Sequence, residues 1–330
     1  MSQLPPEAYR IFAKAAGGAL TGTPDLKTHQ VIAAVSGGLD SMVLLRFLMW
    51  LRQKVSFDLI VAHLDHGLRE EADADATLVA SYAASFDLPF HLQKEDVAAR
   101  AGREGEGLEA AGRRARYEFF STLSEAGEKP SYIALAHHRD DQAETVLLHL
   151  TRGSGLKGLA GMRELDGDRW RPFLQLSRAE LEMVADVLQI PYAVDRTNET
   201  RDFLRNRLRL DLLPRWSELA GHDMTKKLAD LATLADLDDQ ALDQVAAEVR
   251  QETATGRYQL SVAALITYPD AIIRRVLDLV FGEVTDGGRL SKRHIVSLLE
   301  ALKASEMRQI DLPSGVRAKI SYGQLSFVTG

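Results

Sequence analysis

The stretch Val31–Leu45, VIAAVSGGLDSMVLL, constrains the fold more than any other part of the sequence. An apolar run, Val31–Val35, stops at two glycines, an acid and two hydroxyl residues, and a second apolar run follows at once. Such a break is typical of a tight turn between a buried strand and a buried helix. Gly37 and Gly38 permit backbone conformations and close approaches that a side chain would block. The N–H groups of this turn and of the helix N-terminus then suit a phosphate group.

The polar residues of the turn indicate which anion it suits. Ser36 and Ser41 offer hydroxyl donors, and Asp40 offers a carboxylate. A carboxylate beside phosphates requires a cation between them, so Asp40 is a candidate Mg²⁺ ligand. The lysine of the ordinary P-loop, G-x-x-x-x-G-K-[ST], is absent, which argues against transfer of a γ-phosphate. The structural alternative is a glycine-rich strand–helix turn in which Asp40 only begins the helix.

Short apolar runs alternate with longer helical patterns around this turn. We predict strands at Val31–Val35, Leu59–His63, Phe90–Gln93 and Ile133–Ala136. We predict helices near Ser41–Arg52, Ala72–Phe86, Leu108–Glu125 and Asp140–Leu150. Strands of this kind, separated by helices, predict an α/β fold with a doubly wound, Rossmann-like parallel sheet. Ligands of such sheets bind at the carboxyl ends of the strands.

The later part of the chain predicts a second, smaller domain that is mostly helical. The glycine-rich passage 152–161 is expected to be a loop, and Ser177 with Glu180 forms a capping box. We divide the chain into a catalytic domain, residues 1–216, and a C-terminal domain, residues 217–330, with a long linking helix. The spacing of that helix, broken at Asp238, also fits a dimeric coiled coil. Further helices and strands are predicted at Ala271–Phe281, Lys292–Leu302, Ile310–Leu312, Val316–Ile320 and Leu325–Val328.

Composition excludes several classes of protein. The formal net charge of −7 argues against a uniformly basic coat, although it allows local basic patches. The sequence contains no cysteine, so it cannot form disulfides, thiolate metal sites or a cysteine nucleophile. It has no apolar stretch of signal-peptide or membrane-span length. We therefore expect a soluble cytoplasmic protein.

A polar cluster after the fourth predicted strand suggests a second binding site. His137, Asp141 and Glu144 are spaced i, i+4, i+7 and would share one face of a helix. Two carboxylates on one face of an embedded helix suit an ammonium ligand better than a metal ion, since only one histidine could join them. The alternative is a solvated polar face.

These motifs together carry a resemblance to a known family. SGGLDS resembles the PP-loop of N-type ATP pyrophosphatases, which cleave ATP between the α- and β-phosphates and adenylate a substrate oxygen. In order with HLDHGLR, EAAGRRARY, HHRDDQAET, RGSGLKGLAGM and DRTN…RNRLR…LLP, it resembles the bacterial tRNA(Ile)-lysidine synthetases. That resemblance is specific from about Val31 to Trp216. It implies ligation of L-lysine to the wobble cytidine of an isoleucine tRNA with a CAU anticodon, with ATP and Mg²⁺, through an adenylated cytidine.

The resemblance also implies roles for individual residues. ATP would bind at Ser36, Gly37, Gly38, Leu39, Asp40, Ser41 and His63. Asp40 would also hold Mg²⁺ and, with Arg113 and His137, take part in catalysis. Lysine would bind to Asp141 and Glu144. The segment Arg205, Asn206, Arg207 and Arg209 would contact tRNA, assisted by the basic residues of the C-terminal domain. We expect a monomer or homodimer without membrane contact.

Two departures from the family pattern and three competing functions complete the analysis. Gly112 stands where the family commonly has alanine, and we expect the chain to lack the extra C-terminal domain of longer members. A tRNA-thiolating PP-loop enzyme that works through persulfides or a metal cluster would need thiols. An amidotransferase-type synthetase would need a glutaminase cysteine. A relic RNA-binding module would be expected to have lost Asp40 or a glycine of the turn, and both are intact.

Overall fold

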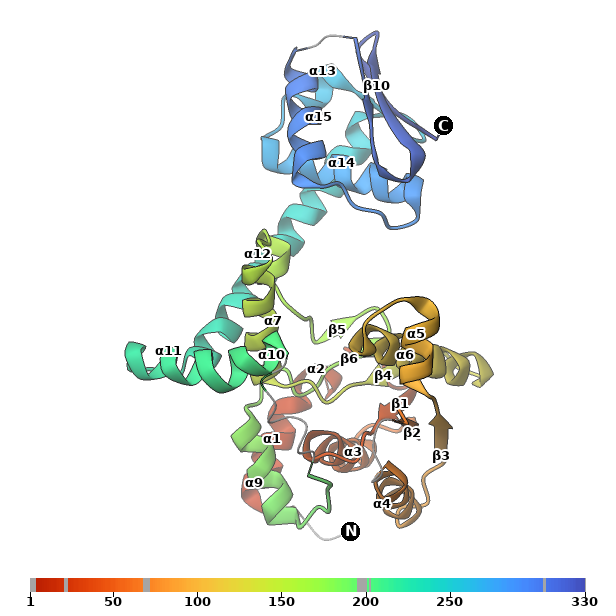
Figure 1. Ribbon diagram of the computed structural model, residues 1–330, viewed down its shortest axis with the longest axis vertical. Coiled ribbons are helices and arrows are strands. Elements are labelled where there is room, and N and C mark those ends of the chain that lie inside the picture. Colours follow the sequence, from red (N-terminus) through yellow and green to blue (C-terminus); the bar gives the residue numbers. More distant parts are fainter. Residues whose placement is uncertain are drawn as a thin grey trace. The chain divides into compact units, whose positions relative to one another are not determined.

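The structure is a computed structural model that describes residues 4–20, 23–67, 72–194, 201, 203–304 and 307–329. It divides into two compact units, Met1–Thr233 and Leu234–Gly330. Figure 1 shows the chain coloured from red at the N-terminus to blue at the C-terminus, with the first unit in red to green.

The centre of the first unit is a six-stranded sheet with the order β3-β2-β1-β4-β6-β5. Its strands are β1 (Gln30–Ala34), β2 (Asp58–Asp65), β3 (Phe90–Lys94), β4 (Ser131–Ala134), β5 (Leu165–Asp166) and β6 (Arg169–Trp170). Every neighbouring pair is parallel except the β5–β6 hairpin. The predicted parallel sheet is therefore confirmed. Strand β1 pairs with β2 on one side and β4 on the other, so the strand order reverses beside β1, where open sheets of this type bind ligands.

Helices cover both faces of this sheet, as the doubly wound fold requires. Figure 1 shows α3 (Leu39–Arg52) and α4 (Ala72–Ala84) on one side of the sheet, and α5 (Val97–Glu104) and α6 (Leu108–Ala126) on the other. Alternate residues of β1 pack into the two hydrophobic cores, one on each face of the sheet. Val31 and Ala33 pack in the core of α3, whereas Ile32 packs with Phe119 and Phe120 of α6.

The helices of the first unit that were not predicted include α1 (Pro6–Ala15), α2 (Gly17–Leu20) and α5. Helix α1 buries Ala8, Ile11, Phe12 and Ala15 in the same core as α3, a spacing that places them on one face. The prolines at the start of α1 make this apolar spacing hard to recognise as a helix in the sequence. Pro6 lies in the first turn, where a helix needs no N–H from that residue.

A separate small core forms where α7 (Arg139–Thr151) meets the later helices of the first unit. Ala143, Val146 and Leu147 of α7 pack against Leu208 and Leu213. These later elements are α8 (Leu156–Leu159), α9 (Arg178–Leu188), α10 (Leu204–Arg207), a π-helical segment at Leu208–Leu212 and α11 (Leu213–Ala220). The glycine-rich passage, expected to be a loop, therefore contains one helical turn, α8. The predicted capping box of Ser177 and Glu180 at α9 is confirmed.

The second unit combines helices with a five-stranded antiparallel sheet of order β7-β8-β11-β10-β9. Its elements after α12 (Met224–Thr253) are β7 (Ala254–Gly256), β8 (Gln259–Ser261), α13 (Val262–Leu265), α14 (Asp270–Thr285), α15 (Lys292–Ala304), β9 (Arg308–Asp311), a 3₁₀ turn at Pro313–Gly315, β10 (Val316–Ser321) and β11 (Gln324–Thr329). The two helices and three strands predicted here are confirmed, whereas β7, β8 and α13 were not predicted.

Helix α12 is the long helix that the spacing predicted. The apolar spacing is broken at Asp238 because the buried position in this turn of the helix is the next residue, Asp239. The carboxylate of Asp239 forms a 2.8 Å ion pair with Arg275 of α14. The division into units falls within α12, and the functional division after residue 216 stays a prediction. Within the described ranges, none of the helices is long and apolar enough to cross a membrane.

Candidate active site

The glycine turn joins β1 to α3 at the point where the strand order reverses. Gly37 has φ +89°, a conformation that side chains rarely adopt, which explains a glycine at this position. Ser41 Oγ accepts from the Ser36 N–H at 3.1 Å and donates to the Gly38 carbonyl at 2.9 Å. The Ala193 N–H donates to the Gly37 carbonyl at 3.0 Å. The turn is therefore held in shape by its own hydroxyls and by a segment far along the chain.

Helix α3 begins at this turn without a side-chain cap. Gly38 is the N-cap residue and has no side chain to accept a hydrogen bond from the first turn. Leu39, Asp40 and Ser41 follow it and line a cavity of about 480 Å³. Uncapped N–H groups at a helix N-terminus attract anions, so this end of the cavity suits phosphate.

The same cavity collects residues from the ends of three parallel strands. It is lined by Ser36 after β1, His66 after β2, and Ala136 and His137 after β4. Asp141 and Arg178 contribute from α7 and α9. Six residues of the predicted ATP and catalytic set line it: Ser36, Gly38, Leu39, Asp40, Ser41 and His137. The sheet thus brings together motifs that are about 100 positions apart in the sequence.

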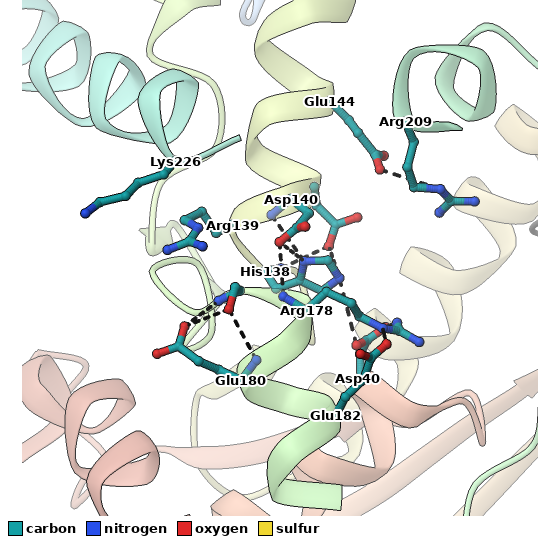
Figure 2. A network of polar contacts seen from close by, with 12 residues as sticks. Asp40, His138, Arg139, Asp140, Glu144, Arg178, Glu180, Glu182, Arg209 and Lys226 are labelled. Atoms are coloured by element: carbon teal, nitrogen blue, oxygen red, sulfur yellow. Dashed lines mark hydrogen bonds and ion pairs between the residues drawn. The ribbon is translucent and has the colours of Figure 1, made fainter. Parts of the chain in front are cut away.

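The two carboxylate oxygens of Asp40 have different surroundings. Its Oδ2 accepts from Arg178 Nη1 at 2.5 Å, whereas its buried Oδ1 has no hydrogen-bond partner and lies 3.8 Å from His138 Nε2. Burial raises the pKa of Asp40, against the lowering effect of His138 and Arg178. Figure 2 shows Asp40 and Arg178 at one end of this polar network. A carboxylate oxygen without a donor is available to a cation.

His138 connects Asp40 to α7, and the sequence analysis did not select it. Its Nε2 lies 3.5 Å from Asp141 Oδ2, and its Nδ1 lies 3.2 Å from the backbone nitrogen of Asp140, at the N-terminus of α7. Burial lowers the pKa of His138, but Asp141, Asp140 and Asp40 outweigh it and raise that pKa to about 9. The protonated ring cannot accept at Nδ1 and instead faces Asp140 Oδ2 at 3.5 Å.

His137 has the opposite environment, although it is the neighbouring residue. Burial lowers the pKa of its imidazole to about 4, and Arg171, Arg205 and Arg116 add to this against Asp141. Its Nδ1 is buried without a hydrogen-bond partner. The imidazole of His137 is therefore neutral at neutral pH, and a pKa this low makes it a weak base.

Asp141 and Glu144 lie together on α7 as the spacing predicted, but they are already paired with arginine. Arg205 Nε lies 2.5 Å from Glu144 Oε2, and Arg205 Nη2 lies 2.8 Å from Asp141 Oδ1. Arg209 Nε lies 3.9 Å from Glu144 Oε1, a pair shown in Figure 2. Burial raises the pKa of Glu144, against the effect of Arg205. The residues predicted for lysine and those predicted for tRNA therefore form one cluster.

The four predicted tRNA contacts differ in their surroundings. Arg205 and Arg209 point to the carboxylates of α7, and Arg209 Nη2 also donates to Asn206 Oδ1 at 3.4 Å. Arg207 is exposed. The preceding motif residues Asp195–Asn198, like Leu68 and Arg69 of the second motif, lie outside the described residues.

Several predicted site residues do not line the cavity: Gly37, His63, Arg113 and Glu144 are not among its lining residues. His63 is buried, and its Nδ1 bonds to the Val35 carbonyl at 2.8 Å, directly before the turn. Arg113 lies over the Tyr117 ring, with 5.2 Å from its guanidinium carbon to the ring centroid. Arg116, one turn along α6, lines the cavity instead. The helical period of 3.6 residues allows both Arg113 and Arg116 to face the sheet edge, so the motif alone does not distinguish them.

Gly112 makes room for a residue of the cavity. A Cβ atom at this position would lie 3.3 Å from His66 Nδ1 and 3.4 Å from His66 Cε1. His66 lines the cavity, and its Nε2 lies 3.4 Å from Arg116 Nη2. The departure from the family's alanine therefore allows this imidazole to lie close against α6.

Comparison with known proteins agrees with this arrangement. The family model described as the PP-loop domain matches residues 12–216, which contain the sheet, the glycine turn and the whole cavity. The chain belongs to the PP-loop family. The matched residues include the turn at residues 36–41 and the uncapped N-terminus of α3.

Relatives of this PP-loop chain carry names that describe tRNA modification. It is 33% identical over 309 residues to the tRNA(Ile)-lysidine synthase of Clostridium acetobutylicum, covering 91% of this chain and 66% of the relative. It is 36% identical over 311 residues to the tRNA(Ile)-lysidine synthase of Geobacter sulfurreducens, covering 90% of this chain and 64% of the relative. The chain thus spans just under two thirds of the length of these relatives.

A solved structure supports the fold. The U34-tRNA thiolase NcsA of Methanococcus maripaludis, determined with its [4Fe-4S] cluster, superposes with a TM-score of 0.57 at 17% identity. The match covers 70% of this chain and 80% of the thiolase. This similarity confirms a PP-loop fold and carries no chemistry, since the present sequence has no cysteine.

Proposed function

We propose that the chain acts as a tRNA(Ile)-lysidine synthase, joining L-lysine to the wobble cytidine of isoleucine tRNA with a CAU anticodon and converting ATP to AMP and pyrophosphate. One observation carries the proposal: a single cavity is lined both by a helix N-terminus of the kind that binds phosphate and by the carboxylate of Asp141, which shares Arg205 with the buried Glu144. The names of the relatives supply the amino acid and the RNA.

The first step would occur at the PP-loop end. The cytidine oxygen O2 forms a bond to the α-phosphorus of ATP, and the bond to the β-phosphate oxygen breaks, which releases pyrophosphate. Ser36, Gly37, Gly38, Leu39 and Ser41 would hold the departing phosphates. His63 would support this site from beneath, through its bond to the Val35 carbonyl.

The residues present fit the Mg²⁺ that this chemistry implies. In the described ranges, no group of three or more histidine or acidic side chains could hold a metal ion by itself. Asp40 offers one buried carboxylate oxygen without a hydrogen-bond donor. Asp40 would therefore hold Mg²⁺ together with oxygens of the nucleotide and water. When bound, Mg²⁺ would neutralise part of the negative charge on the phosphates.

The second step would occur at the carboxylate end. The ε-amine of lysine forms a bond to C2 of the activated ring, the C2–O bond breaks, and AMP leaves. A lysine amine is mostly protonated at neutral pH and must lose a proton before it attacks. Asp141 and Glu144 would bind the ammonium, and His137, neutral beside Asp141, would lie next to the reacting carbon. Arg113 and Arg116 would stabilise charge on the phosphate.

Transfer RNA would contact both units. In the first unit, Arg205, Asn206, Arg207 and Arg209 are the proposed contacts. In the described part of the second unit, the exposed basic residues are Arg257, Arg289, Lys292, Arg293, Lys303, Arg308, Arg317 and Lys319. Arg317 and Lys319 alternate with buried residues on β10 and so share the outer face of that sheet. We propose a monomer or homodimer that acts in the cytoplasm, where its RNA substrate is found.

The direct test is incorporation of labelled lysine into RNA. Purified protein, ATP, Mg²⁺, radiolabelled L-lysine and isoleucine tRNA transcript with a CAU anticodon should give acid-precipitable label and one pyrophosphate for each lysine. A transcript with a UAU anticodon is the matched control and should give neither product. Release of pyrophosphate without label in the CAU transcript would contradict the proposal.

A further inference from the structure

The contact between Arg205 and the two carboxylates of α7 raises a question of charge. One edge of the Arg205 guanidinium, Nε and Nη2, reaches Glu144 at 2.5 Å and Asp141 at 2.8 Å. Glu144 is the most enclosed of the three, with 2% of its side chain exposed. In the structure, the proposed ammonium site therefore already holds a cation from the chain itself.

A second cation cannot simply be added to this cluster. The two carboxylates carry at most two negative charges, and Arg205 and Arg209 both face Glu144. An ammonium beside the guanidinium would experience repulsion between like charges in a buried setting. Arg205 can leave more easily than the carboxylates, since 35% of its side chain is exposed and it belongs to α10, a helix of only one turn.

We propose that Arg205 is a resident cation of the amine site, which the ε-ammonium of lysine displaces and which then pairs with a phosphate of the RNA. This inference rests on the proposed function and extends it, because it couples the two substrates. RNA that draws Arg205 away would leave Asp141 and Glu144 open to lysine. Lysine that displaces Arg205 would free a guanidinium for RNA, so each substrate should strengthen the binding of the other to the same degree.

The test is direct binding of L-lysine to the protein alone, by isothermal titration at pH 8 without ATP or tRNA. Removal of a competing cation predicts that Arg205→Met binds lysine about tenfold more tightly than the wild type. Arg215→Met, which removes an exposed arginine that pairs with Glu218 on α11, is the matched control and should leave lysine affinity unchanged. Unchanged or weaker binding by Arg205→Met would overturn the inference and make Arg205 a residue that only positions the carboxylates. Arg205→Lys retains a cation and should lie between the two.

A second arm measures the coupling. Saturating tRNA should tighten lysine binding to the wild type, and this effect should vanish in Arg205→Met. Equal tightening in both proteins would contradict the exchange of Arg205. The two proposals fail differently: if the function is wrong, the wild type forms no lysidine and Glu144→Gln does not alter lysine binding. If only the Arg205 inference is wrong, the wild type forms lysidine while Arg205→Met gains no affinity.

Discussion

Asp40 is the residue at which the nucleotide chemistry can be tested most simply. Asp40→Asn keeps the size of the side chain and can still accept from Arg178, but it loses the charge that would hold Mg²⁺. We expect tRNA-dependent pyrophosphate release to fall by about a hundredfold or more, since removal of one preorganised electrostatic group commonly has this effect. Phosphate-coupled absorbance measures the rate.

The matched control for Asp40 is Glu182, the other carboxylate that pairs with Arg178, at 3.1 Å. Glu182→Gln removes an ion pair to the same arginine outside the cavity lining, so pyrophosphate release should stay near the wild-type rate. A wild-type rate in a folded Asp40→Asn protein would show that this carboxylate does not hold the metal.

The lowered pKa of His137 predicts that the stability of the first unit depends on pH. This pKa is about 4 in the folded protein and about 6.5 in an unfolded chain, so the unfolded state binds more protons between these values. The free energy of unfolding should therefore fall as the pH drops from about 6.5 to 4, by roughly 2 kcal/mol after allowance for partial exposure. Urea unfolding followed by tryptophan fluorescence measures this in the first unit, because Trp50, Trp170 and Trp216 all belong to it.

A variant that lacks only the His137 ring separates this effect from the titration of carboxylates. His137→Gln removes the titrating ring while leaving a polar side chain at the end of β4. Between about pH 6.5 and 4, the free energy of unfolding of His137→Gln should fall less than that of the wild type, and the difference should be roughly 2 kcal/mol. Parallel declines in the two proteins would mean that His137 is not held neutral.

At the scale of elements, α10 and the π-helical segment that follows it present arginines with two different surroundings. Arg209 lies against Glu144, so its replacement would disturb the carboxylate cluster as well as any RNA contact. Arg207 is exposed and gives the cleaner test. Arg207→Ala should weaken tRNA binding several-fold and reduce the slope of log K against log salt by about one, as the loss of one phosphate contact does. The affinity for ATP should not change.

Filter binding of tRNA over a range of salt concentrations checks this prediction. Arg103→Ala, which alters an exposed arginine on α5, is a control for the general loss of one positive charge. An Arg207 variant that binds tRNA normally but ATP weakly would reverse the assignment of this segment.

The elements show how far local sequence patterns reach. Strands β1 to β4 and helices α3, α4, α6 and α7 follow directly from apolar periodicity, and the turn follows from its glycines. The β5–β6 hairpin has two residues in each strand and leaves no periodic signal. Helix α5 was missed for a related reason, since its eight residues include two arginines and only a short apolar face.

At the scale of the whole molecule, the pairings that shape the site are the ones that the sequence did not predict. Arg178 meets Asp40 across 138 positions, and Arg205 meets Glu144 across 61. Each charged residue is visible in the sequence, but its partner depends on how α9 and α10 pack beside α7. His138 was overlooked because it adjoins His137 and no local pattern distinguishes the two neighbours. Only the three carboxylates around His138 reveal its different character.

The central claim is that one cavity carries out two steps at two ends, and Glu144→Gln tests it most directly. Both products are counted in one reaction that contains ATP, Mg²⁺, labelled lysine and isoleucine tRNA. The variant keeps the PP-loop intact and should still release pyrophosphate in the presence of tRNA, while lysine incorporation at low lysine falls about ten- to a hundredfold, as expected for a lost charged hydrogen bond. Asp40→Asn should lose both products together. Loss of pyrophosphate release in Glu144→Gln, with an unchanged lysine requirement, would place this carboxylate in the nucleotide site and contradict the account.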